Sequence, residues 1–153
     1  MAGINKVASG YDDVYEATVV IEGGILAIPA AGATNPGKQG IAIAGDAATN
    51  VVGVTARRAE PVANQNLVGT DGDGYPIAYA NPVSELTTVY KQCVAPVTYT
   101  AVAVAFGVKL CAAAGGNVRA WVSGTDPAHS IIGECRVVGG MGAAGGVGLA
   151  FIY

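Results

Sequence analysis

The side chains in this sequence best suited to catalysis are one histidine and three cysteines. A thiol acts as a nucleophile only with a base beside it, and His129 is the one imidazole that Cys111 or Cys135 could use. His129 lies in residues 125–130, a predicted turn between strands, where a single histidine is usually solvated. Pairing with either cysteine stays an open alternative, but the main expectation is a protein with no catalytic residue, not an enzyme.

The cysteines and acidic residues also show no complete spacing of a metal site. Cys93, Cys111 and Cys135 are 18 and 24 residues apart, whereas zinc sites use paired Cys-X-X-Cys ligands. Residues 71–74, Asp-Gly-Asp-Gly, resemble the start of a calcium loop, but the twelfth position of that loop is Pro82 instead of a glutamate. We predict a surface turn there and no bound metal.

Two glycine-rich segments approach nucleotide-binding motifs. Residues 32–39, Gly-Ala-Thr-Asn-Pro-Gly-Lys-Gln, nearly match a P-loop, but Gln39 replaces the hydroxyl that binds magnesium. Residues 140–145 match the spacing of the dinucleotide fingerprint, Gly-X-Gly-X-X-Gly. Both motifs need a helix directly after them, and residues 40–43 and 147–153 are predicted strands. We therefore expect two loops and no cofactor.

The composition favours association with other protein subunits. Only 12% of the residues are charged and 52% are hydrophobic, so charge alone covers the surface of a monomer poorly. The formal net charge of −3 argues against nucleic acid as a partner, since phosphate binding needs a basic surface. We expect part of the apolar surface to meet other subunits.

The sequence predicts neither a membrane span nor disulfide bonds. Residues 92–108 carry no charge, but Pro96 and a period of two favour sheet over a membrane helix of about 20 residues. Residues 1–6 lack the apolar run of a signal peptide, and an odd number of cysteines favours buried free thiols. We expect folding in a reducing cytoplasm, with no membrane partner.

Hydrophobic alternation and turn residues predict a chain of short strands. We predict an N-terminal arm over residues 1–13 and a single β domain over residues 14–153, made of a module 14–59, a connecting region 60–85 and a module 86–153. The expected strands include residues 14–22, 25–30, 40–44, 51–59, 98–105 and 147–153. Short helical turns are conceivable after Asp46 and after Asn81, each of which suits a helix cap.

The order of strands and turns occurs twice, around residues 24–56 and around residues 107–138. Each copy reads as strand, turn, strand, Gly/Asp turn and strand. What recurs is apolar alternation and turn chemistry, with no recurring catalytic group. The predicted fold is all-β, a compact β-sandwich or small β-barrel (β-tulip-like) built from two related strand-turn-strand modules, with little helix.

Five side chains are candidates for contact with partners or for the core. Tyr11 is assigned to an interface, and Tyr15 suits an interface and the core equally well. If residues 51–59 form a strand, Arg57 and Arg58 point to opposite faces, as solvated or ion-paired side chains. Trp121 is expected in a strand and in the core. The residues predicted for an interface are Tyr11, Tyr15, Arg57 and Arg58.

The second copy resembles the small head decoration (cement) proteins of tailed bacteriophages. The resemblance lies in Gly-Val-Lys-Leu at 107–110, Asn-Val-Arg-Ala-Trp-Val-Ser-Gly-Thr-Asp at 117–126, Ile-Ile-Gly-Glu-Cys at 131–135 and the strand 147–151. In particular, the Trp, the Gly/Thr/Asp turn and the later apolar strand are similar to the lambda head decoration protein. The likeness covers residues 97–151, with residues 14–59 as a looser copy.

This resemblance implies a structural protein of the virion. It implies a homotrimer on the exterior of an expanded capsid, assembled in the host bacterial cytoplasm, that cements neighbouring subunits of the major capsid protein. The arm through Tyr15 is expected to reach a neighbour by strand addition. The alternatives are another β-sandwich virion component, such as a shell or fibre-base subunit, and a small trimeric ligand-binding or enzymatic β protein.

Overall fold

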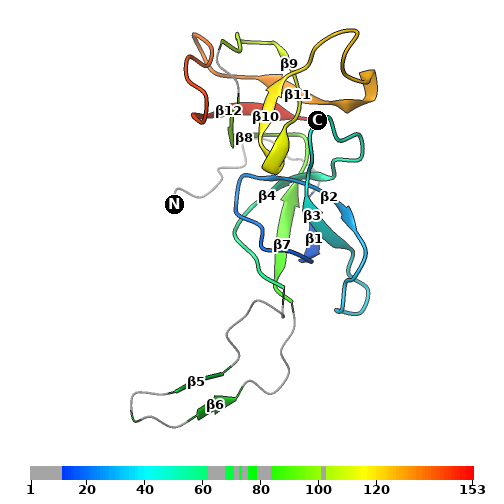
Figure 1. Cartoon of the computed structure of the whole chain (residues 1–153), viewed down its shortest axis with the longest axis vertical. Helices are drawn as coiled ribbons and strands as arrows, with labels where there is room; N and C mark the ends of the chain where they lie inside the picture. Colours follow the sequence, from blue (N-terminus) through cyan, green and yellow to red (C-terminus); the bar gives the residue numbers. More distant parts are fainter. Residues whose placement is uncertain (1–11, 62–67, 71–72, 74–75, 79–83, 101–102) are drawn as a thin grey trace.

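The computed structural model describes residues 12–61, 68–70, 73, 76–78, 84–100 and 103–153 (Figure 1). The first part contains strands β1 (Asp12–Ala17), β2 (Leu26–Ala30), β3 (Gly40–Ile43), β4 (Gly53–Thr55), β5 (Val68–Thr70), β6 (Pro76–Ala78) and β7 (Leu86–Tyr90). The second contains β8 (Cys93–Thr98), β9 (Lys109–Ala112), β10 (Val118–Ala120), β11 (Ile131–Cys135) and β12 (Val147–Ile152), with 3-10 turns η2 (Ala114–Gly116) and η3 (Ala128–Ser130). The predicted all-β class is confirmed.

Five strands close into a barrel in the order β1-β3-β2-β4-β7. β1 is parallel to β3, and the other pairings are antiparallel. Pro29 lies within β2 without breaking a hydrogen bond of the sheet. The Ala27 carbonyl accepts from the Val52 N–H on the β4 side, and the backbone groups of Pro29, two residues later, point to the same side. Because β4 pairs only with Leu26 and Ala27, the missing N–H of Pro29 costs no ladder bond.

The other large sheet has the order β10-β9-β11-β12-β8, and its neighbours are all antiparallel. In β8 the odd-numbered residues are buried, which matches the period of two in the sequence. Tyr99, just beyond β8, makes a parallel bridge to Val118 of β10, so the two outer strands come together at one end. The sheet is therefore strongly curled.

The repetition in the sequence is a repetition of topology. β2 lies between β3 and β4, and β9 lies between β10 and β11, with antiparallel pairing throughout. Each copy is thus a three-stranded unit whose first strand occupies the middle. The two related modules are confirmed at this level.

One apolar core crosses from the barrel into the curled sheet. Its buried members include Leu26 and Val54 from the barrel and Val97, Leu110 and Ile152 from the other sheet. A second, smaller cluster of Ile21, Ala27, Ile41 and Val89 fills the barrel. The chain passes between the two sheets at Lys91 and Gln92, and Gln92 takes a φ of 48°.

Backbone contacts also join the two sheets. The Ala47 N–H donates to the Ala112 carbonyl at 3.0 Å, and the Gly116 N–H donates to the Ala44 carbonyl at 2.9 Å. Gly116 has a φ of 71°, and a β-carbon there would lie 2.3 Å from Ile25 Cγ2. Only glycine permits this approach of η2 to the barrel.

Several predicted strand boundaries are wrong. The strand predicted over 51–59 is only β4, because a bend follows Thr55, and the strand predicted over 14–22 is β1, which begins at Asp12 and ends at Ala17. The strand predicted over 98–105 is displaced: β8 ends at Thr98, and Ala103 has a φ of 61° that no strand tolerates.

Two predicted helical turns have different outcomes. Asp46 caps no helix, because only residues 46 and 47 form a turn and the Asp46 carboxylate binds Arg119 instead. Asn81 lies outside the described residues. Within the connecting region 60–85, β5 and β6 form an antiparallel hairpin that Figure 1 places at the end of the molecule away from the curled sheet.

Candidate interaction surface

The predicted interface tyrosine Tyr15 lies on β1, paired with Thr87 of β7. Its half-buried side chain packs against the barrel cluster that contains Ile21 and Val89. Tyr15 is thus partly a core residue, and its role in an interface stays a prediction. Tyr11 lies outside the described residues, so its assignment to an interface stays a prediction.

Arg57 and Arg58 follow the bend after β4 and are held by their own chain. Arg57 Nη2 donates to the Leu86 carbonyl at 2.9 Å. Arg58 Nε lies 2.9 Å from Glu22 Oε1, and its Nη2 pairs with Glu60. These exposed contacts agree with the ion-paired interpretation, and a role of the two arginines in an interface stays a prediction.

The P-loop-like segment binds an anion, and that anion belongs to this protein. The Thr34 N–H, the Thr34 hydroxyl and the Asn35 N–H donate to the carboxylate of Glu16 at 2.7–2.9 Å. Glu16 is fully buried. Burial alone would raise its pKa, but these hydrogen bonds lower the pKa of Glu16 to about 2. The amides that could bind a phosphate are occupied by β1.

A cluster around Arg119 joins the two sheets. Arg119 Nη1 and Nη2 bind the two oxygens of Asp126, each at 2.7 Å, and its Nε binds Asp46 Oδ1 at 2.8 Å. The hydrogen bonds with Asp126 and Asp46 raise the pKa of Arg119, and Arg119 holds the pKa of each aspartate below its ordinary value. The Val122 N–H also donates to Asp126. This cluster fixes the Gly/Thr/Asp turn against β10.

The two candidate nucleophilic thiols have partners other than histidine. The Cys111 thiol contacts Asp126 Oδ2 at 3.8 Å and the Ala120 carbonyl at 3.9 Å, and the Cys135 thiol contacts the Val104 carbonyl at 3.8 Å. Burial raises the pKa of Cys111 to about 11. All three cysteines are buried thiols, as the sequence predicts. The structure does not bring His129 into these contacts.

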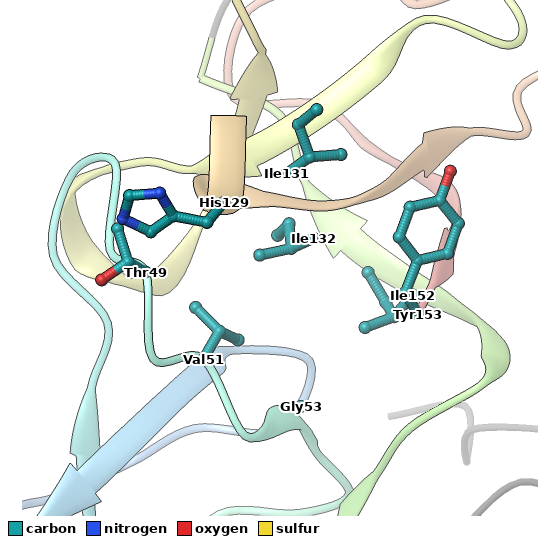
Figure 2. Close-up of a pocket in the computed structure, with 8 residues that line it drawn as sticks. All are labelled: Thr49, Val51, Gly53, His129, Ile131, Ile132, Ile152 and Tyr153. Carbon is teal, nitrogen blue, oxygen red and sulfur yellow. The ribbon is translucent and has the colours of Figure 1, made fainter. Parts of the chain in front are cut away.

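His129 instead lines a small pocket between the two sheets (Figure 2). The pocket measures about 110 Å³, whereas sites for small organic ligands span about 300–1,000 Å³. Val51, Ile132 and Ile152 lie between His129 on one side and Tyr153 on the other in Figure 2. Among the residues with described positions, no three His, Cys, Asp or Glu side chains gather as metal ligands would.

Trp121 corrects another prediction, because it is neither in a strand nor in the core. β10 ends at Ala120, and the half-buried indole donates from Nε1 to the Pro127 carbonyl at 3.1 Å. The ring therefore supports the turn that contains Asp126. A polar handle on a large ring suits this position at the edge of the fold.

The curled sheet carries an apolar surface that is not among the interfaces predicted from the sequence. The odd-numbered residues of β12, drawn in red in Figure 1, face outward, with Val147 69% exposed and Leu149 47% exposed. We call the following residues the outer face: Val147, Leu149, Phe151 and Tyr153, with Phe106, Lys109, Glu134 and Arg136 beside them. Four of the eight exposed large apolar side chains in the described part of the chain belong to it, so they gather instead of being scattered.

The charges of the outer face are neutralised within it. Lys109 Nζ lies 3.3 Å from Glu134 Oε2 and donates to the Tyr153 hydroxyl, while Arg136 pairs with Glu134. Arg136 also stacks near two rings, 5.6 Å from the centroid of Phe106 and 5.8 Å from that of Phe151. The alternation of large and small residues over 147–151 was the signal in the sequence that could have revealed this face.

The comparisons with known proteins bear on the fold. No protein-family model matches the sequence, and no curated protein matches it. The fold is similar to that of a bacteriophage head-fibre base. The match is to the crystal structure of the N base of the head fibre protein gp8.5 of bacteriophage phi29, with a TM-score of 0.51 and 14% sequence identity, and it covers 94% of this chain and 93% of that chain.

The phi29 head-fibre base shares the fold of this chain at low sequence identity. It is again a structural protein of a bacteriophage, but one different from the lambda head decoration protein. Both sheets must take part, since the match covers nearly the whole chain. A further finding concerns membranes: no helix in the described ranges has the length and hydrophobicity to cross one.

Proposed function

We propose that this chain is a non-enzymatic structural protein of a bacteriophage virion, bound to the outside of the head through the major capsid protein. The observation that supports this most is the similarity in fold to a head-fibre base over almost the full length of both chains. The low charge of the sequence and the gathered apolar residues of the outer face agree with a protein that works by binding surfaces.

Within this function, a fibre base comes first and a cement protein second. The similarity to the phi29 head-fibre base favours a base that attaches a projection to the capsid. The resemblance of residues 97–151 to decoration proteins favours cementing of neighbouring capsid subunits. Both roles suit a homotrimer on the capsid exterior, assembled in the host cytoplasm, and neither requires nucleic acid, a membrane or a cofactor.

The experiment is to incubate purified protein with empty expanded capsids and to sediment the mixture. Saturable binding supports the proposal, and protein left wholly in the supernatant contradicts it. The two roles differ in a second readout, because a ligand of the assembled shell stabilises that shell by mass action. A cement protein binds the joints between capsid subunits, which exist only in the shell, and so raises the temperature at which capsids disrupt. A fibre base that binds within one capsid subunit also binds the released subunit, and raises that temperature little.

The N-terminal arm is tested in the same assay. Asp12 and Asp13 pair with Tyr90 and Val89 in β1, so the deletion should remove residues 2–11 and leave the barrel intact. We expect this variant to keep its β circular dichroism and to lose capsid binding. Unchanged occupancy on capsids would show that the arm has no part in attachment.

A further inference from the structure

The charges of this chain are divided between its two sheets. Residues 12–90, which contain the strands of the barrel and β5 and β6, include nine acidic and three basic residues, a net charge of −6. Residues 91–153, which form the curled sheet, contain two acidic and four basic residues, a net charge of +2. The two parts of the chain therefore carry net charges of opposite sign.

The outer face lies on the basic half. Its large apolar side chains are exposed, and its three charged groups are paired with one another as Lys109–Glu134 and Arg136–Glu134. Covering the face therefore leaves no charge without a partner, while the face keeps a net charge of +1. Such a surface fits an occupant that is weakly charged at the contact and acidic overall.

The neighbouring sheet edge suits an occupant less well. β8 is the last strand of its sheet. The N–H and the carbonyl of Tyr99 both form hydrogen bonds on the β12 side, so the odd-numbered residues face β12 and the backbone groups of the even-numbered residues point away from it. Pro96 stands at the centre of this edge and has no N–H to offer. Gly24 also approaches the Pro96 carbonyl closely. The edge is protected, whereas the face is not.

We propose that the outer face is a contact between copies of this chain, and that it takes the acidic barrel of the next copy. Opposite charge on the two surfaces favours this head-to-tail contact over one between two identical basic faces. A head-to-tail contact uses different surfaces on the two partners, and it ends in a closed ring when the rotation permits. The contact thereby supplies a route to the homotrimer. The number of three copies rests on the proposed function, whereas the contact itself does not.

The test measures the mass of the protein in solution without capsids, by sedimentation velocity over a range of concentrations. We expect the unaltered chain to form oligomers and Leu149→Asn to weaken association at least about tenfold, because it removes an apolar side chain from the contact. Leu149→Asp should weaken it further, since the added negative charge meets an acidic partner. Val122→Asn is the matched control, because Val122 is 49% exposed but lies outside the outer face.

Each outcome decides the matter. A chain that stays monomeric at all concentrations, or a Leu149→Asn variant that associates as the unaltered chain does, overturns the proposal. Equal association of the Asp and Asn variants overturns the acidic barrel as occupant. If circular dichroism shows that a Leu149 variant is unfolded, Val147→Asn and Val147→Asp replace it, since Val147 is still more exposed. If the unaltered chain forms oligomers but does not bind capsids, the result counts against the proposed function and leaves this proposal standing.

Discussion

Arg119 of β10 binds Asp46, which follows β3, with Nε 2.8 Å from Oδ1 and Nη2 3.2 Å from Oδ2. The two residues are 73 positions apart and belong to different sheets. The same guanidinium holds Asp126, which is buried, whereas the side chain of Asp46 is 59% exposed. One arginine therefore makes an inner and an outer ion pair, and these should differ in their effect on stability.

Substitution of Arg119 by methionine should destabilise the protein strongly, because it leaves Asp126 buried without its cation. Asp46→Asn removes only the exposed pair, which is worth at most about 1 kcal/mol. We expect the loss in the free energy of unfolding for Arg119→Met to be several times larger, as measured by urea denaturation. Equal losses for the two variants would show that Asp126 is solvated in the absence of Arg119.

Glu16 should make the stability of the protein depend on acid pH. Its folded-state pKa of about 2 lies below the ordinary value of 4.5, so the ionised form stabilises the fold. That contribution is complete above about pH 5 and is lost as the pH falls toward about 2. Glu16→Gln should cost about 1.5–3 kcal/mol at pH 7 and should reduce the fall in stability between these pH values.

The measurement for Glu16 is urea denaturation at a series of pH values. Asp46 and Asp126 also have lowered pKa values, so the informative quantity is the difference between the unaltered chain and the variant. Glu22→Gln, at an exposed glutamate, controls for the general loss of negative charge. Parallel pH profiles for the Glu16 variant and the unaltered chain would contradict the burial of an ionised Glu16.

Gly116→Ala should destabilise the junction of the two sheets. The new β-carbon would meet Ile25 Cγ2 at 2.3 Å and the Leu26 carbonyl oxygen at 2.8 Å, and the φ of 71° is unfavourable for alanine. Gly124→Ala is the matched control, since Gly124 has a φ of 80° and no heavy atom within 4 Å of such a carbon. We expect the control to cost about 1 kcal/mol and Gly116→Ala about 1–3 kcal/mol more. Thermal unfolding of both variants measures the difference.

The three thiols should resist alkylation in the folded protein. Cys93, Cys111 and Cys135 are buried, and the pKa of Cys111 is raised to about 11, so little thiolate exists at pH 8. Iodoacetamide should modify none of them within minutes, and all three after unfolding in urea, as counted by mass spectrometry. Rapid modification of Cys111 or Cys135 in the folded state would revive the cysteine–histidine alternative.

Much of the fold follows from local patterns in the sequence. Alternation places Thr87 and Val89 on the inner side of β7, and the turn residues separate the three strands of each repeated unit. These signals depend only on neighbours in the chain, so sequence alone predicts them. They also explain why the all-β class and the two related modules are correct.

Other features depend on partners that are distant in sequence. The P-loop-like segment was correctly assigned to a loop, but its ligand, Glu16, lies 18 residues earlier on another strand. The bend after Thr55 is braced by Arg57, whose partner Leu86 lies 29 residues away. No local pattern announces such contacts, and for this reason the strand predicted through both arginines is wrong.

The outer face illustrates the difference between features that local sequence predicts and features that depend on distant contacts. Residues 147–151 alternate in size, and this local pattern is enough to predict a strand with two unlike sides. Which of these sides faces solvent depends on packing between distant residues, and the structure exposes Val147 and Leu149. A β-carbon at Gly148 would lie 3.2 Å from the ring of the buried Tyr99 and 2.6 Å from Met141 Sδ, so the core has no room for a larger residue at that position. Packing against these two residues directs Val147 and Leu149 outward.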